Sequence, residues 1–201
     1  MKPTDILSSE HRVIEQVLDC LEHIIVEANA NGRLDATSAR DAISFFRTFA
    51  DQCHHGKEET HLFPAMEAKG FPREGGPTGV MRHEHETGRG CIRAMDGAVD
   101  AAAHGDYAAL QLFAQAGEGY IGLLRQHIEK EDHCLFSMAN QALADEDQAE
   151  LMAKFEKVEA EEMGRGTHEK FLAIAEALAE KYCVPQKAAA HAGHGMACCH
   201  H

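Results

Sequence analysis

The apolar side chains recur at a helical period along almost the whole chain, in steps that alternate between three and four residues. They predict four long helices, which run over about 3–29, from 35 to the break at Lys69-Gly70, from 78 to 104 and from 106 to 144. Gly32 supplies the stop after the first helix, and residues 69–77, with three glycines and two prolines, form the clearest loop. Helices of roughly 40–50 Å joined by short turns favour an all-α, up-down-up-down four-helix bundle.

The helical pattern continues beyond residue 144. Three acidic residues at 145–147 suit the first turn of a fifth helix, which we expect to reach Val184 and to pack on the outside of the bundle. Residues 185–201 are small, polar and rich in His and Cys, which predicts a flexible tail. Its soft ligands suit copper(I), zinc or nickel, although incidental affinity explains them equally well. We therefore expect a bundle over 1–144, an accessory helix over 145–184 and the tail.

Composition narrows the classes of function. The 201 residues carry 19 basic and 33 acidic side chains, a net charge of −14 with His neutral. Such a surface repels phosphate and disfavours nucleic-acid and anionic-membrane partners. No apolar run approaches the length of a membrane span and no signal peptide pattern is present, so we expect a cytoplasmic protein. The seven cysteines are odd in number and scattered, so we expect no disulfide framework, and the oligomeric state stays open.

Histidine is the unusual feature, because fifteen His outnumber the nine Phe and three Tyr together. Imidazole at this density suggests metal ligation or proton chemistry. The histidines also belong to an internal repeat, in which residues 54–63 align with residues 127–136 and Glu10-His11 aligns with Glu84-His85. The chain therefore reads as two helical hairpins, each with one lone His and one His-x-x-x-Glu. A pseudo-twofold axis would bring these six residues to one level of the interior.

The spacing of these residues predicts a metal site. Residues four apart share a helix face, so that each His-x-x-x-Glu motif turns both side chains toward the core. Two buried carboxylates among imidazoles need a cation, because an unpaired buried charge is costly. Six ligands are too many for a four-coordinate structural zinc, so we expect two metals bridged by the carboxylates, with iron favoured and manganese or zinc as alternatives. The predicted ligands are His11, His54, Glu58, His85, His127 and Glu131.

These motifs resemble the hemerythrin-like, or HHE cation-binding, domain over about residues 5–140. The residues that carry the resemblance are Glu10-His11, His54-x-x-x-Glu58-Glu59 before Leu62-Phe63-Pro64, Glu84-His85-Glu86, and His127-x-x-x-Glu131 before Leu135-Phe136. The resemblance implies a four-helix bundle around a non-haem di-iron centre, oxo- or hydroxo-bridged, that meets dioxygen, peroxide or nitric oxide. Oxygen-carrying hemerythrins use five His and end in His-x-x-x-x-Asp, whereas this chain has Glu131, and Arg89 where a second His would follow His85. It is therefore more similar to the iron-handling branch.

Other side chains near these motifs have two interpretations each. His61, seven residues after His54, is either an interior His packed near the site or a fifth nitrogen ligand. Tyr120, seven residues before His127, either brings a catalytic hydroxyl near the metals or is a hydrogen-bonded core Tyr. Glu59 and Asp132 either support the metal ligands or lie on a solvated helix face. We expect His55, His83 and His133 on the surface, because these residues fall off the apolar stripes.

Two classes of function fit this pattern. One is redox chemistry on a small molecule, either a catalase-like decomposition of peroxide or the oxidation of iron, which would connect the protein with oxidative stress. The other is binding without turnover, in which the protein senses or stores oxygen, nitric oxide or iron, or donates iron as the iron–sulfur cluster repair proteins do. A structural zinc bundle is a third alternative. The sequence favours the redox class.

Overall fold

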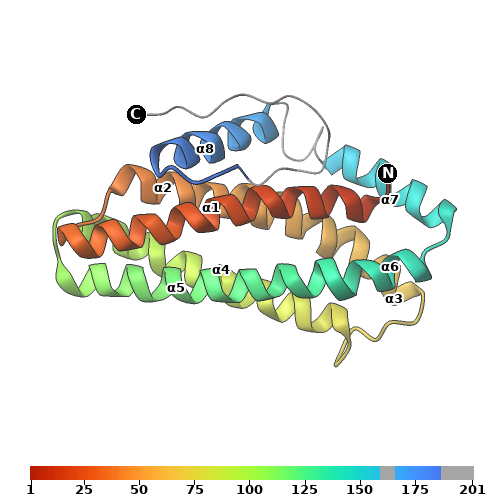
Figure 1. Ribbon diagram of the computed structural model, residues 1–201. Helices are drawn as coiled ribbons and strands as arrows, with labels where there is room; N and C mark the ends of the chain where they lie inside the picture. The colour runs from red at the N-terminus through yellow and green to blue at the C-terminus, as the bar shows by residue number, and fades with distance from the viewer. Residues whose placement is uncertain (159–165, 187–201) are drawn as a thin grey trace.

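The computed structural model describes residues 1–158 and 166–186, and every regular element in these two stretches is a helix (Figure 1). Four long helical stretches contain most of them. The first is α1 (Pro3–Asn31); the second joins α2 (Ala36–Phe45), η1 (Phe46–His55), η2 (Glu58–Leu62) and α3 (Phe63–Ala68); the third is α4 (Pro77–Ala103); the fourth joins α5 (Tyr107–Lys130), η3 (Glu131–Leu135) and α6 (Phe136–Ala142). Over the described residues the chain is thus all-helical, as its apolar pattern predicts.

The long helices lie side by side and enclose a common interior. α4 and α5 form the most extensive pair, and α1 lies against both α5 and α2. η1 contacts α1 and α4, so that the four stretches surround one core. In Figure 1 they run roughly along the same long axis, which makes the molecule a helical bundle.

Short local signals set the helix ends. Gly32 adopts a left-handed conformation, with a φ of +68°, directly after α1. The Asp35 side chain accepts hydrogen bonds from two backbone N–H groups in the first turn of α2, and Asp106 does the same for one N–H group of α5. The ends predicted from these residues are confirmed closely.

Two five-residue π-helical segments interrupt the regular helices at equivalent places of the internal repeat. η2 begins at Glu58 and η3 begins at Glu131, the carboxylates of the two His-x-x-x-Glu motifs. A longer π-helical segment, η1, ends at His55. The apolar spacing predicts uninterrupted α-helices at these places, and this prediction is wrong. In a π-helical turn the hydrogen bond joins residues i and i+5, so that the turn contains one residue more than an α-helical turn. Such turns are frequent at functional sites.

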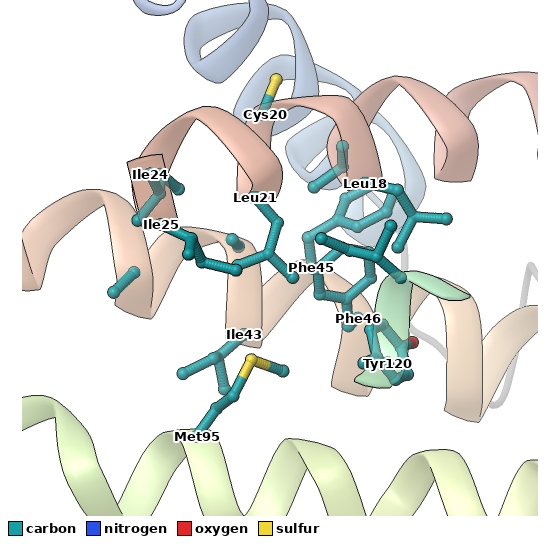
Figure 2. Close-up of a cluster of buried hydrophobic side chains, with 14 of the residues drawn as sticks. Leu18, Cys20, Leu21, Ile24, Ile25, Ile43, Phe45, Phe46, Met95 and Tyr120 are labelled. Atoms are coloured by element: carbon teal, nitrogen blue, oxygen red, sulfur yellow. The ribbon is translucent and has the colours of Figure 1, made fainter. Parts of the chain in front are cut away.

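Two clusters of buried apolar side chains fill the bundle. The larger cluster draws on α1, α2, η1, α4, α5 and α8, and Figure 2 shows its centre. There Phe46 packs edge-to-face against Tyr120, with ring centroids 4.9 Å apart. The smaller cluster lies toward the other end of the bundle and includes Phe63, Phe136 and Phe155. A polar layer separates the two clusters and contains the residues of the predicted metal site.

The described residues after the bundle contain two helices, where the apolar pattern predicts a single fifth helix. α7 (Asp145–Lys157) lies against α1 and η2, and α8 (Thr167–Lys181) lies over α1, α2 and η1. Gly166, with a φ of +83°, precedes α8 in a conformation that does not continue a right-handed helix. Residues 159–165, and residues 187–201 with most of the predicted tail, lie outside the described residues. No helix within the described part of the chain is long and apolar enough to cross a membrane.

Candidate metal centre

Polar side chains from the four long stretches meet between the two apolar clusters. Along α1, His11 lies between Leu7 of the smaller cluster and Ile14 of the larger one. In each of the other long stretches, the polar residues also lie between residues of the two clusters. The side chains of this layer are at most 4% exposed. They are His11, His54, His55, Glu58, His85, His127 and Glu131. The structure thus brings together the six residues predicted from the repeat, and adds His55 to them.

Their potential ligand atoms form two overlapping groups, and within each group all atoms lie within 4.8 Å of one another. One group consists of His11, His54, Glu58 and Glu131, and the other consists of His55, Glu58, His85 and His127. Glu58 belongs to both groups, and Glu131 Oε2 also lies 3.3 Å from His127 Nε2 of the second group. Two carboxylates that each reach both groups are placed to bridge two cations.

Many of these ligand atoms have no hydrogen-bond partner among the described residues. Both carboxylate oxygens of Glu58 and both of Glu131 are buried and lack such a partner. The same holds for the Nε2 atoms of His11, His54 and His55. A buried polar atom left without a hydrogen bond costs about 1–3 kcal/mol, and more if it is charged. A bound cation would remove this cost, so the donor set fits a metal centre.

The shortest distances between these atoms also suit coordination. His85 Nε2 lies 3.1 Å from His127 Nε2, and His11 Nε2 lies 3.2 Å from Glu131 Oε2. Two ligand nitrogens about 2.1 Å from one ion, and at right angles to each other, would be about 3.0 Å apart. The Glu58 oxygens stand somewhat farther off, at 3.5 Å from His85 Nε2 and 3.8 Å from His54 Nε2. Neighbouring atoms in the layer are therefore spaced as adjacent ligands of a common ion.

A carboxylate stands behind each of the five imidazoles and accepts a hydrogen bond from its Nδ1–H. The pairs and their distances are His11–Asp132 at 2.9 Å, His54–Glu10 at 2.9 Å, His55–Asp51 at 3.4 Å, His85–Glu59 at 2.6 Å and His127–Glu84 at 2.9 Å. Such a bond fixes the tautomer and turns Nε2 toward the metal, as in most metal-ligating histidines. Of the two interpretations for Glu59 and Asp132, the structure places both side chains in the supporting position.

The two halves of the repeat use matching contacts. Glu10 and Glu84 each bind the imidazole of their own hairpin, and each also forms an ion pair with a lysine, Lys57 in the first half and Lys130 in the second. The Lys57 side chain is fully buried beneath the ring of Phe155 from α7, whereas that of Lys130 is 41% exposed. The pseudo-twofold symmetry of the inner residues is thus broken from outside, by the helices that come after the bundle.

Burial and neighbouring charges set the protonation of the layer. Burial and the nearby Glu131 carboxylate raise the pKa of Glu58 well above its usual value. Burial also tends to raise the pKa of Glu131. The facing imidazoles outweigh this effect, with His127 contributing most, and the pKa of Glu131 is therefore lowered. Burial lowers the pKa of His54 to about 4 and that of His85 to about 2. The Glu131 carboxylate outweighs burial at His127 and raises the pKa of that imidazole to about 9, and Asp132 and Glu131 raise the pKa of His11. Because metals bind neutral imidazole and ionised carboxylate, a cation would displace protons from Glu58 and from His127.

His61 and Tyr120 lie apart from the ligand groups. The half-buried ring of His61 lies 6.4 Å from that of Phe155, and among the described residues His61 belongs to neither group. His61 thus lies outside both ligand groups, and its role as a fifth nitrogen ligand stays a prediction. Tyr120 is buried against Phe46, and burial raises the pKa of its hydroxyl, so that the side chain keeps its proton.

The prediction that His55 lies on the surface is wrong. Successive side chains of an α-helix point about 100° apart, so that the neighbour of an inward His54 should point away from the core. η1 is π-helical and has more residues per turn, which narrows that angle and lets both histidines face inward. The surface predictions for His83 and His133 are confirmed. The one signal for His55 in the sequence is that two histidines are consecutive.

A cavity of about 240 Å³ opens beside one of the two groups. Its inner wall includes His55, His85 and His127, and none of the other four residues of the layer lines it. Phe46 and Tyr120 contribute to its apolar wall. A small molecule that enters this cavity therefore meets the second ligand group and not the first.

Comparison with known proteins agrees with this geometry. The family model for the hemerythrin HHE cation-binding domain matches residues 2–139. The chain belongs to this family. Its buried layer of His and Glu is accordingly that of a metal-binding helical domain.

The relatives found by sequence carry no stated activity. They include the uncharacterized protein Rv1995 of Mycobacterium tuberculosis (strain H37Rv) and the uncharacterized protein Mb2018 of Mycobacterium bovis. Each is 26% identical to this chain over 162 residues, which cover 81% of this chain and 62% of the relative. The chain thus spans about three fifths of the length of these relatives. No solved structure matches the chain significantly.

Proposed function

We propose that this hemerythrin-like protein holds two non-haem iron ions in its polar layer and uses them in redox chemistry on dioxygen, peroxide or nitric oxide. The observation that carries the proposal is the pair of buried carboxylates, Glu58 and Glu131, which lie among five imidazoles and have no hydrogen-bond partner among the described residues. Imidazole together with carboxylate suits iron, with manganese or zinc as alternatives. Short connections between the long stretches, at 32–35 and 104–106, support an up-down-up-down course for the bundle that holds the ions.

The residues of the layer would divide the work between two positions. His11 and His54 would hold one ion, His85 and His127 the other, and the two glutamates would bridge them. Bound iron would supply the redox chemistry, by giving electrons to a small molecule or by accepting electrons from it. The chain's own part is to fix the five imidazoles through their carboxylates and to bury the layer between two apolar clusters.

The cavity supports a reaction with a small molecule from outside. It leads from the surface to the imidazoles of His85 and His127, and its volume of about 240 Å³ exceeds what a diatomic gas or a peroxide needs. Tyr120 lines it and keeps its proton. Its hydroxyl is therefore the candidate donor of a hydrogen bond, or of a proton, to a ligand in the cavity.

Binding without turnover is the second candidate, and one observation favours it. The cavity reaches one ligand group only, so that an outside molecule would meet a single ion and could leave unchanged. Sensing or storage of oxygen or nitric oxide would use the same residues in this way.

An optical experiment separates the two candidates. The full-length protein is loaded with iron, its metal content is measured, and it is reduced without oxygen. Oxygen is then added and removed under vacuum. Irreversible conversion to the oxidised diferric spectrum, with oxygen evolution on later addition of peroxide, is the expected result. Recovery of the colourless reduced spectrum over repeated cycles would favour binding, and a protein that takes up no iron would refute the proposal.

A further inference from the structure

We infer that His55 is a ligand of the metal ion on the cavity side, and that Asp51 and Arg89 position its imidazole. This inference rests on the proposed function, because it adds a residue to the proposed centre. It concerns a side chain that the internal repeat does not predict, since the counterpart of His55 in the second hairpin is Ile128.

The surroundings of His55 match those of the four repeat histidines. Its Nε2 is buried without a hydrogen-bond partner among the described residues, and its ligand atom lies within 4.8 Å of those of Glu58, His85 and His127. Its Nδ1 faces the carboxylate of Asp51 at 3.4 Å, so that His55 shares the carboxylate–imidazole arrangement of the other four. The ring also stacks on that of His85, with centroids 3.8 Å apart and planes 13° apart, which fixes its direction.

Arg89 lies in the cavity wall and binds the carboxylates behind two of the imidazoles. Its Nε donates to Asp51 Oδ1 at 2.9 Å, and its Nη2 donates to Glu59 Oε1 at 2.9 Å. Asp51 stands behind His55 and Glu59 stands behind His85. A single guanidinium therefore orients the carboxylates behind two imidazoles of the same ligand group. Lysine lacks the planar fork that holds two acceptors at once.

The two metal positions are consequently not equivalent. With His55 included, the cavity-side position has three imidazoles, whereas the enclosed position has His11 and His54. Nitrogen-rich sites bind late divalent ions such as Co²⁺ more firmly than carboxylate-rich sites do. The loss of His55 should therefore weaken one of two bound ions and leave the other almost unchanged.

Titration of the metal-free, full-length protein with Co²⁺ tests the inference, with visible absorption and metal content as readouts. The wild type should bind two equivalents. His55→Ala should weaken one equivalent by about tenfold or more and change its absorption bands. His83→Ala is the matched control, because it removes an exposed histidine of α4, and it should bind both equivalents as the wild type does. If His55→Ala fails to keep the helical content of the wild type, His55→Gln takes its place.

The positioning residues have their own test in the same titration. Asp51→Asn and Arg89→Met should weaken the same equivalent by about 10–100-fold, and Arg89→Lys should recover only part of the loss. Wild-type affinity and absorption in the His55 variants would overturn the inference while leaving the proposed centre intact. A wild-type protein that binds fewer than two equivalents would instead overturn the proposed function. Wild-type behaviour of Arg89→Met would overturn the role given to Arg89.

Discussion

Glu58 is fully buried, and neither of its carboxylate oxygens has a hydrogen-bond partner among the described residues. In the metal-free protein this side chain lowers stability, because its polar atoms are removed from water without compensation. Replacing it by a side chain of similar size without polar oxygens should therefore stabilise the fold. We expect Glu58→Met to raise the free energy of unfolding of the metal-free protein by about 1–3 kcal/mol, measured by urea denaturation.

The same substitution should have the opposite effect once metal is present. The wild type gains stability from bound ions, whereas Glu58→Met lacks a bridging carboxylate and should gain much less. Glu118→Met, at an exposed position of α5, is the control and should leave both metal-free and metal-loaded stability near wild type. A metal-free Glu58→Met protein that is less stable than wild type would contradict this account.

Asp132 stands behind His11 and also accepts hydrogen bonds from Ser8 and Arg12. We expect Asp132→Asn to lower the affinity for one metal ion by about 10–100-fold, because the amide can present its NH₂ group to the imidazole and release it from its fixed direction. Metal titration followed by elemental analysis measures the loss. Glu129→Gln, at an exposed position three residues earlier in the same helical stretch, should bind metal as the wild type does. Equal losses in both variants would mean that general charge, rather than the contact to His11, is responsible.

The six repeat residues could be predicted because two simple regularities coincide. Residues four apart share a helix face, and the duplication of the motif in a second hairpin makes chance alignment improbable. His55 could not be found in this way, because its inward direction depends on the π-helical geometry of η1. That geometry has no sequence signature in the apolar spacing, which assumes a constant number of residues per turn.

Among the helices, the ends were predictable and the π-helical segments were not. Gly32, Asp35 and Asp106 act through their own backbone or side chain on the adjacent turn, so their effect is visible in a short piece of sequence. The split of the expected fifth helix into α7 and α8 depends on Gly166 and on the faces that the bundle offers. Only the glycine is visible in the sequence, and glycines occur inside helices of this protein as well.

Two glycines of α5 give a test of packing at this scale. A Cβ atom at Gly117 would lie 2.7 Å from Ile25 Cδ1 and 3.3 Å from Met95 Sδ, in the cluster of Figure 2, whereas a Cβ atom at Gly119 would meet nothing within 4 Å. Gly119→Ala should raise the free energy of unfolding by about 0.5–1 kcal/mol through helix propensity alone. Gly117→Ala has the same benefit but crowds the core, and should be about 1–3 kcal/mol less stable than Gly119→Ala.

Thermal or urea unfolding of the two variants, with the same metal content in each, measures the difference. Both changes add one methyl group to the same helix, so that they control for each other. Equal stabilities would show that Ile25 and Met95 yield without loss, and that α1, α4 and α5 are less tightly packed here than the structure indicates.

Over the whole molecule, the internal repeat describes the inside well and the outside poorly. The two buried glutamates and four of the imidazoles obey the pseudo-twofold pattern, but α7 and α8 cover one side of the bundle while the cavity lies among η1, α4 and α5. A duplicated motif predicts the residues that face each other at the centre. It says nothing of the helices α7 and α8, which have no counterpart in the repeat.

The His/Cys-rich end of the chain should not contribute to the centre, because every potential ligand of the two groups lies between residues 11 and 131. We expect a protein truncated after Gln186 to keep about two iron ions per chain and the absorption spectrum of the full chain. Iron content per folded protein, with helical content checked by circular dichroism, measures this. Loss of all iron from a truncated protein that remains folded would show that the removed residues take part.

The two π-helical segments that begin at Glu58 and Glu131 also mark where the chain can change its length. Each takes in one residue more than a regular turn, so that removing one residue can restore an ordinary helical turn and keep the downstream helix in phase. Thr60 is an exposed residue of η2, and its deletion should be tolerated far better than deletion of an exposed residue within α1 or α4. At these two points, deletion of a single residue would change the direction of Glu58 or Glu131 without dismantling the helices.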